Sequence, residues 1–168
     1  MFGCGCWAQH CKSSGVAVTT SGCGEQLMMT TLAKTIGEAI LREEDCSPAF
    51  CLKECMTELF INSEMLTSDA HEIMGGVLLA YYHDRSVDFN LAFTTDSMAV
   101  GFMGTNQDRA TVRVSRSHSS STSLPTKSRL TMEGFIVNLW VTSHPAVDRV
   151  QIHDHGLCFG VHWRKNLM

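Results

Sequence analysis

One stretch of the chain, residues 73–82 (IMGGVLLAYY), consists almost entirely of apolar side chains and glycine. A strand of this composition is typically buried on both faces, because a strand with one solvated face alternates apolar and polar residues. The next segment does alternate, with apolar side chains at Val87, Phe89, Leu91 and Phe93. The two segments therefore predict consecutive strands, the first buried on both faces and the second half-buried.

The rest of the first 116 residues predicts further strands and two helices. Residues 15–20 (GVAVTT) alternate and are β-branched, which favours a strand. Apolar residues recur every four positions from Met28 to Ile40 and predict a helix over about residues 25–44. A second helix is predicted from Ser47, an N-cap residue type that proline follows, with Leu52, Cys55, Met56 and Leu59 on its buried face. Two more strands are predicted over residues 98–103 and 110–115. This order predicts an α+β fold, with helices packed on a mainly antiparallel sheet.

The chain divides by composition into three parts. Residues 1–116 have the pattern of a folded region, whereas residues 117–134 are rich in serine and threonine and predict a linker. Residues 135–168 are irregular, and we expect a poorly structured tail in which residues 135–142 could form one more strand. His153, Asp154 and His155 in this tail suggest a metal site or a catalytic triad, but we favour a solvated tail.

Charge and hydropathy exclude several functional classes. The net charge is −4, with 13 lysines and arginines against 17 acidic residues, so we expect no nucleic-acid partner. The longest apolar run, residues 77–82, is too short to span a membrane. The first residues lack the basic and apolar regions of a secretory signal, so we expect a protein that is not secreted. Its eight cysteines are then expected to be free thiols.

The cysteines also suggest metal binding, which we consider the weaker interpretation. Cys4, Cys6 and Cys11 with His10 do not have the spacing of common zinc sites. Cys46, Cys51 and Cys55 are expected to pack as small apolar side chains. We therefore predict no metal and no cofactor.

A glycine-rich segment between the first strand and the first helix is the best candidate site. Ser21, Gly22, Cys23 and Gly24 can turn backbone N–H groups toward a ligand, and the start of a helix favours an anionic or carboxylate guest. The alternative is a tight turn that needs glycine only for its conformation, and spacing alone favours this alternative.

Two motifs resemble one family. Residues 2–8 (FGCGCWA) and 17–25 (AVTTSGCGE) are similar to the β-subunit of the threonine aspartases (taspases), in the type 2 asparaginase and isoaspartyl-peptidase family of N-terminal-nucleophile hydrolases. Weaker similarities lie at residues 27–33, 74–77 and 94–103. The resemblance implies an αββα sandwich, of which this chain would be a part.

The resemblance also implies a function. In that family a precursor cleaves itself, and the freed N-terminal threonine attacks the carbonyl of the amide bond that follows aspartate, while its own α-amine acts as the base. The expected activity is threonine-type endoproteolysis of nuclear regulatory proteins, in a nuclear or cytoplasmic enzyme. The expected partners are protein substrates with aspartate before the cut site, an α-subunit and a second αβ unit. Substrate-binding positions carried over from the family are Ser21, Gly22, Cys23 and Gly24.

The family's processing site, Asp-Gly-Thr-Val-Gly, does not occur in the sequence. Thr19, Thr20, Thr30 and Thr31 are internal and have no free α-amine. We therefore expect a chain that begins after the nucleophile, contains no catalytic residue of its own and is inactive alone. The alternative is a non-catalytic truncated variant that pairs with full-length subunits.

Overall fold

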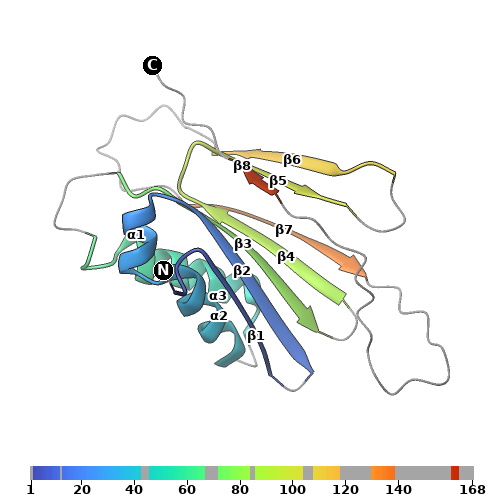
Figure 1. Ribbon diagram of the computed structural model, residues 1–168, viewed down its shortest axis with the longest axis horizontal. Coiled ribbons are helices and arrows are strands. Elements are labelled where there is room, and N and C mark those ends of the chain that lie inside the picture. Colours follow the sequence, from blue (N-terminus) through green and yellow to red (C-terminus); the bar gives the residue numbers. More distant parts are fainter. Residues whose placement is uncertain are drawn as a thin grey trace.

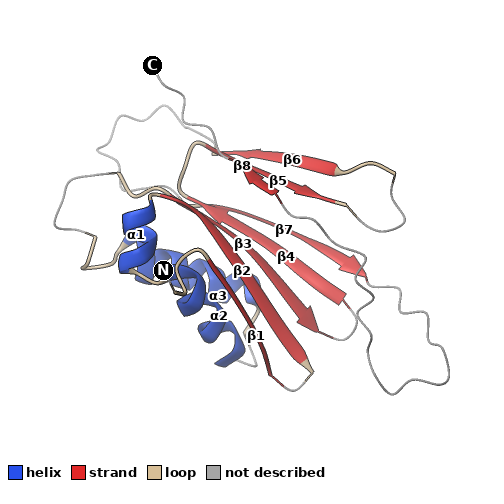
Figure 2. Ribbon diagram, in the orientation of Figure 1, coloured by secondary structure: helices blue, strands red, loops and turns tan. Residues whose placement is uncertain are grey.

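The structure is a computed structural model that describes residues 2–11, 13–42, 46–66, 72–83, 86–103, 108–117, 130–138 and 160–162. Its elements lie in the following order along the chain (Figure 2): β1 (Cys6–Cys11), β2 (Ser14–Gly22), α1 (Gly24–Met29), α2 (Leu32–Arg42), α3 (Pro48–Glu54), η1 (Cys55–Ile61), β3 (Gly75–His83), β4 (Ser86–Phe93), β5 (Ser97–Phe102), β6 (Thr111–Arg116), β7 (Thr131–Asn138) and β8 (Gly160–His162). No helix in these ranges is long and apolar enough to cross a membrane.

The described strands form two sheets. The larger sheet has the order β1-β2-β3-β4-β7 and the smaller one the order β6-β5-β8, and all neighbouring strands are antiparallel. The helices lie on one face of the larger sheet, and the smaller sheet lies over its other face (Figure 1). The predicted α+β class, with helices on a mainly antiparallel sheet, is confirmed.

Strand β3 is buried on both faces because each face packs against a different layer. Val77 and Leu79 belong to the core under the helices, whereas Leu78 belongs to the core between the two sheets. All three are almost fully buried. Since alternate residues of a strand point to opposite faces, an apolar run is what a middle-layer strand requires. The prediction for this segment is confirmed.

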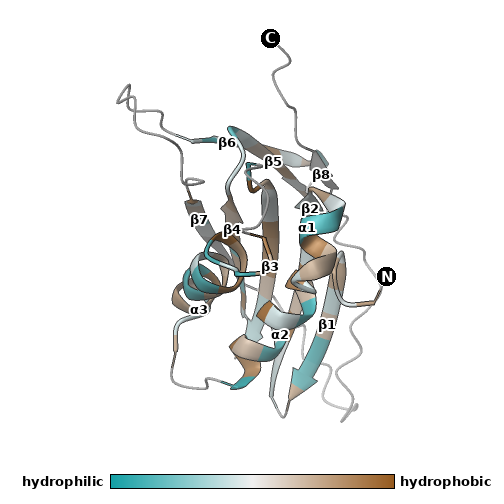
Figure 3. Ribbon diagram, turned by 90° about the vertical axis from the view of Figure 1, so that its left-hand side faces the viewer, coloured by the Kyte–Doolittle hydropathy of each residue, from teal (hydrophilic) through white to brown (hydrophobic). Residues whose placement is uncertain are grey.

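The helical layer contributes the larger of the two cores. The apolar faces of α2, α3 and η1 pack on β2 and β3. Figure 3 shows α2 and α3 beside the larger sheet, with their hydrophobic residues in brown. The fully buried side chains of this core include Val18, Leu32, Ile36, Leu52, Met56, Phe60, Val77 and Leu79. Cys51 and Cys55 are buried in it as well, which confirms that these two thiols pack as small apolar groups.

A second core joins the two sheets. It contains Leu78 from β3, three side chains from β4 and two from β5. The β4 and β5 members are Phe89, Leu91, Phe93, Met98 and Val100. The smaller sheet therefore covers β3 and β4. On β1 and β2 the same face remains open, and Ala8 and Ala17 there are exposed.

The single helix predicted over residues 25–44 is wrong, because two helices occupy this segment. Helix α1 ends at Met29, α2 begins at Leu32, and Thr31 between them has a φ of 43°. The hydroxyl of Thr30 donates to the carbonyl oxygen of Gln26 at 2.9 Å, and the hydroxyl of Thr35 donates to the carbonyl oxygen of Thr30 at 3.1 Å. Such side-chain bonds compete with regular helix hydrogen bonding, and β-branched residues favour helices less than most.

The helix predicted from Ser47 is present, but one of its expected core positions is wrong. Leu52, Cys55 and Met56 are buried as predicted, whereas Leu59 is 43% exposed and Phe60 is buried instead. Element η1 is a π-helix, in which residues five apart share a face. The wider turn therefore places Phe60 rather than Leu59 on the sheet.

Strand β7 pairs with β4 along its whole length, from Phe93 opposite Thr131 to Ser86 opposite Asn138. It crosses the boundary drawn at residue 134 between the predicted linker and tail. Most of both segments lies outside the described residues, and so do His153, Asp154 and His155. The three-part division of the chain therefore stays a prediction.

Candidate functional site

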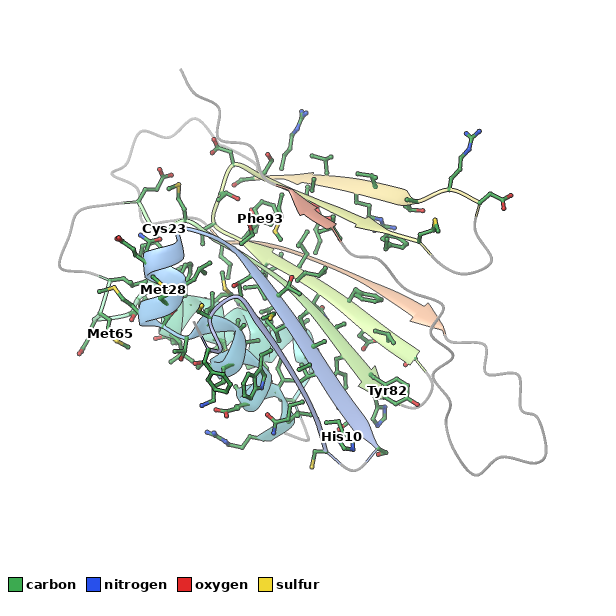
Figure 4. The ribbon with its side chains drawn as sticks, in the orientation of Figure 1. His10, Cys23, Met28, Met65, Tyr82 and Phe93 are labelled. Carbon is green, nitrogen blue, oxygen red and sulfur yellow. The ribbon has the colours of Figure 1, made fainter. Side chains whose placement is uncertain are left out.

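The candidate residues lie where β2 ends and α1 begins. Ser21 and Gly22 are the last residues of β2, Cys23 is the N-cap of α1 and Gly24 is its first residue. Figure 4 shows Cys23 at this junction, above the helix that carries Met28. We call residues 21–24 the 21–24 turn. The structure brings all four predicted residues together, although the first two still belong to the strand.

Gly22 is enclosed by the start of β3. It lies opposite Gly75, and a β-carbon on Gly22 would come within 2.3 Å of the Met74 carbonyl oxygen and 2.7 Å of the Gly75 α-carbon. Its φ of +154° is also one that other residues rarely adopt. Glycine is therefore required here by both space and conformation, which supports the tight-turn interpretation of this position.

Hydrogen bonding along β2 fixes the direction of the Gly22 N–H group. The Thr20 N–H donates to the Gly5 carbonyl at 2.9 Å on the β1 side, and the Cys23 N–H donates to the Met74 carbonyl at 2.8 Å on the β3 side. Successive N–H groups of a strand point to opposite edges. The Gly22 N–H therefore points toward β1.

At this point the chain preceding β1 has left the sheet. The carbonyl of Gly3 accepts the N–H of Lys34 in α2 at 2.8 Å, and the β1–β2 register begins only at Cys6 opposite Thr19. The Gly22 N–H thus lies beyond the end of the β1 ladder. In the described residues no strand pairs with this edge of β2 at Gly22, so its N–H is a candidate donor to a ligand.

Ser21 faces the side of the sheet on which the smaller sheet lies. It pairs with Gly76, whose neighbour on the same face, Leu78, belongs to the core between the sheets. The Ser21 side chain is half-buried. Its hydroxyl and the Gly22 N–H are therefore adjacent polar groups at the open end of β2.

The Cys23 thiol is half-buried, and the backbone N–H of Cys23 donates to the Met74 carbonyl. No side chain caps α1, and the acidic residue in its first turn is Glu25. A helix of six residues adds little dipole beyond its own terminal N–H groups. Of the backbone N–H groups in the first turn of α1, that of Gly24 belongs to the 21–24 turn.

Two further residues support the 21–24 turn, and the sequence pattern did not point to them. Gln26 bonds through its side chain to the backbone of Glu72 and Met74, and the Thr94 hydroxyl bonds to Ile73 and Gly75. The Gln26–Glu72 bond joins residues 46 positions apart in the sequence, and the Thr94–Ile73 bond joins residues 21 positions apart. The only local signal is the glycine pair at the start of β3.

Within the described ranges, no three His, Cys, Asp or Glu side chains are grouped so that they could hold a metal ion. The described cysteines carry thiols rather than disulfides, as predicted: Cys4, Cys6, Cys11, Cys23, Cys46, Cys51 and Cys55. No protein-family model matches the chain. The resemblance to the threonine aspartases therefore rests on the residues of the two sequence motifs.

Proposed function

We propose that the chain is the later part of a threonine-aspartase-like β-subunit, and that it forms one wall of the substrate site of an N-terminal-nucleophile hydrolase. The reaction is endoproteolysis after aspartate in nuclear regulatory proteins. The observation that carries the proposal is the 21–24 turn, a glycine-containing strand-to-helix junction with outward backbone donors in the segment of family resemblance.

The layers of the fold support this proposal. An αββα sandwich has a helical layer outside each sheet, and in the described residues only the larger sheet has one. Val112 and Val114 of β6 are 66% and 59% exposed. They share a face with Ala99 and Gly101 of β5, which pair with them. This apolar outer face is where the second helical layer of the sandwich, supplied by an α-subunit, would pack.

The polar groups of the 21–24 turn suit amide hydrolysis. The Ser21 hydroxyl and the Gly22 N–H can donate to the oxygen of the attacked carbonyl, on which negative charge develops in the transition state. The Gly24 N–H can donate to the aspartate carboxylate before the cut site. Cys23 contributes its backbone to the shape of the turn, because its N–H is bonded to Met74.

The nucleophile of this reaction has to come from residues outside these 168. The internal threonines of the candidate region are held in secondary structure. The Thr20 hydroxyl donates to the Cys4 carbonyl at 2.6 Å, and the Thr30 hydroxyl donates to the Gln26 carbonyl. Their amides are peptide nitrogens, which cannot act as the base that an N-terminal threonine supplies.

The proposed setting follows from the same family relation. The partners are protein substrates that carry aspartate before the cut site, an α-subunit and a second αβ unit, in the nucleus or the cytoplasm. Neither a metal nor a cofactor takes part in the proposed reaction.

The test uses the coding sequence that precedes codon 1, together with a fluorogenic peptide that contains Asp-Gly. The 168-residue chain alone is expected to give no turnover. A polypeptide extended in frame through an Asp-Gly-Thr-Val-Gly segment is expected to cleave itself and then the peptide, and Gly22→Ala in it to abolish peptide cleavage. Turnover by the chain alone, or an inactive extended polypeptide that folds, would contradict the proposal.

The second candidate function is that of a non-catalytic variant that pairs with full-length subunits. The exposed Val112 and Val114 favour it, because an uncovered apolar sheet face can bind a partner. A stop codon and a transcript start directly before codon 1 would favour this alternative. Co-purification of the chain with a tagged α-subunit, without peptide cleavage, would then support it.

A further inference from the structure

Gln26 replaces a missing strand partner at the point where β2 becomes α1. Its side-chain Nε2 donates to the Glu72 carbonyl at 3.1 Å, and its Oε1 accepts the Met74 N–H at 2.9 Å. These two backbone groups, on residues i and i+2, point to the same edge of their segment. The amide of Gln26 therefore bonds to the segment before β3 as another strand residue would.

The start of the helix explains why such a partner is needed. In an uninterrupted antiparallel ladder, Cys23 and Met74 would exchange two hydrogen bonds. Only one is present, from the Cys23 N–H to the Met74 carbonyl at 2.8 Å. The Cys23 carbonyl instead accepts the Leu27 N–H at 3.0 Å, the first bond of α1. Gln26 supplies the acceptor that the Met74 N–H loses.

Thr94 holds the other side of the same segment. Its hydroxyl donates to the Ile73 carbonyl at 2.7 Å and accepts the Gly75 N–H at 3.0 Å. The backbone of residues 72–75 is thereby fixed by one side chain from α1 and one from the residue that follows β4. This is the segment against which Gly22 packs, with no room for a β-carbon.

We propose that Gln26 is a positioning residue, which fixes the angle between β2 and α1 and so the direction of the Gly24 N–H group relative to the Gly22 N–H group that β2 holds. Without its amide the Met74 N–H loses its acceptor, and in the described residues the Cys23–Met74 bond is then the remaining hydrogen bond between this junction and the start of β3. The consequence for substrate binding rests on the proposed function, whereas the consequence for the backbone does not.

The first experiment measures the backbone by amide hydrogen exchange and ¹⁵N NMR on the full chain. Gln26→Met keeps the length of the side chain and removes both bonds, so the Met74 amide is expected to exchange about tenfold faster, the effect of one lost hydrogen bond. The Gly22 and Gly24 amide resonances are expected to shift. Gln9→Met is the matched control, because Gln9 on β1 accepts only the Trp7 indole N–H at 3.2 Å, away from the turn.

Gln26→Glu separates the two bonds. A carboxylate still accepts the Met74 N–H but cannot donate to the Glu72 carbonyl. Met74 is therefore expected to exchange as in the unchanged chain, with smaller shifts at Gly22 and Gly24 than in Gln26→Met. This rescue, at an unchanged midpoint of thermal unfolding, distinguishes positioning from a general loss of stability.

The second experiment titrates the same proteins with acetyl-Asp-Gly-amide. The unchanged chain and Gln9→Met are expected to bind with equal affinity, and Gln26→Met about tenfold more weakly. Unchanged Met74 exchange in Gln26→Met, or unchanged affinity despite faster exchange, would overturn the positioning role. If the unchanged chain does not bind the peptide while the Gln26→Met amide shifts appear as expected, the proposed function fails and the positioning role stands.

Discussion

The carbonyl oxygen of Met74 lies only 2.3 Å from the position that a β-carbon on Gly22 would take. The same oxygen accepts the Cys23 N–H at 2.8 Å. The end of β2 and the start of β3 therefore approach each other so closely that the position of Gly22 is set by backbone against backbone. A flexible side chain could adjust to a new atom at this point, but a bonded peptide group cannot.

Gly22→Ala is therefore expected to destabilise the chain. The new methyl group meets the Met74 carbonyl, and alanine at a φ of +154° is strained, so the loss in free energy of unfolding is expected to be about 2–4 kcal/mol. Urea unfolding followed by circular dichroism measures it. Gly24→Ala is the control, because no atom lies within 4 Å of its β-carbon position. A loss equal to that of the control would show that the strands separate easily here.

Phe60→Ala is expected to cost about 3–5 kcal/mol of unfolding free energy, because the ring is fully buried against the sheet. Leu59→Ala, one position earlier, is expected to cost less than about 1 kcal/mol, since Leu59 is largely exposed. The pair tests the wide turn of η1. If the two costs are reversed, the segment is an ordinary α-helix with Leu59 in the core.

The strands of the fold were predicted from the sequence, whereas two details of its helices were not. Alternation and apolar runs identified the strands, because burial on one or two faces of a sheet leaves a direct mark on the pattern. Phe60 was missed because the α-helical period does not hold in η1. The break at Thr31 was missed because it depends on hydroxyl bonds within the helix, which apolar spacing does not report.

The candidate site was predictable in part for a similar reason. Gly22 and Gly24 stand out in any sequence as turn residues, so the 21–24 turn could be located. Gln26 and Thr94 could not be found, because their bonds reach segments that only the folded sheet brings near. Polar side chains that bond to distant backbone groups have no periodic signature.

Thr94→Val is expected to cost about 1–3 kcal/mol of unfolding free energy, because it removes the hydroxyl that donates to the Ile73 carbonyl and accepts the buried Gly75 N–H. Thr94→Ser retains the hydroxyl and is expected to lose clearly less. Urea unfolding of the two variants measures the difference. Equal losses would assign the effect to the methyl group of threonine, and the hydroxyl would then not fix the start of β3.

The outer face of the smaller sheet is expected to make the isolated chain associate with itself. Val112 and Val114 are exposed beside the small residues Ala99 and Gly101, which leaves a flat apolar surface on an edge strand. Replacing both valines with threonine keeps the β-branched shape and is expected to lower the self-associated fraction, measured by sedimentation velocity. The free energy of unfolding should change by less than about 0.5 kcal/mol per site, because neither side chain is buried.

Val100→Thr on β5 is the control, since Val100 is buried between the sheets. This replacement is expected to destabilise the fold without lowering the self-associated fraction. If the double variant associates as strongly as the unchanged chain, this face is not the surface through which copies meet, and the case for a covering partner layer at this position is weakened.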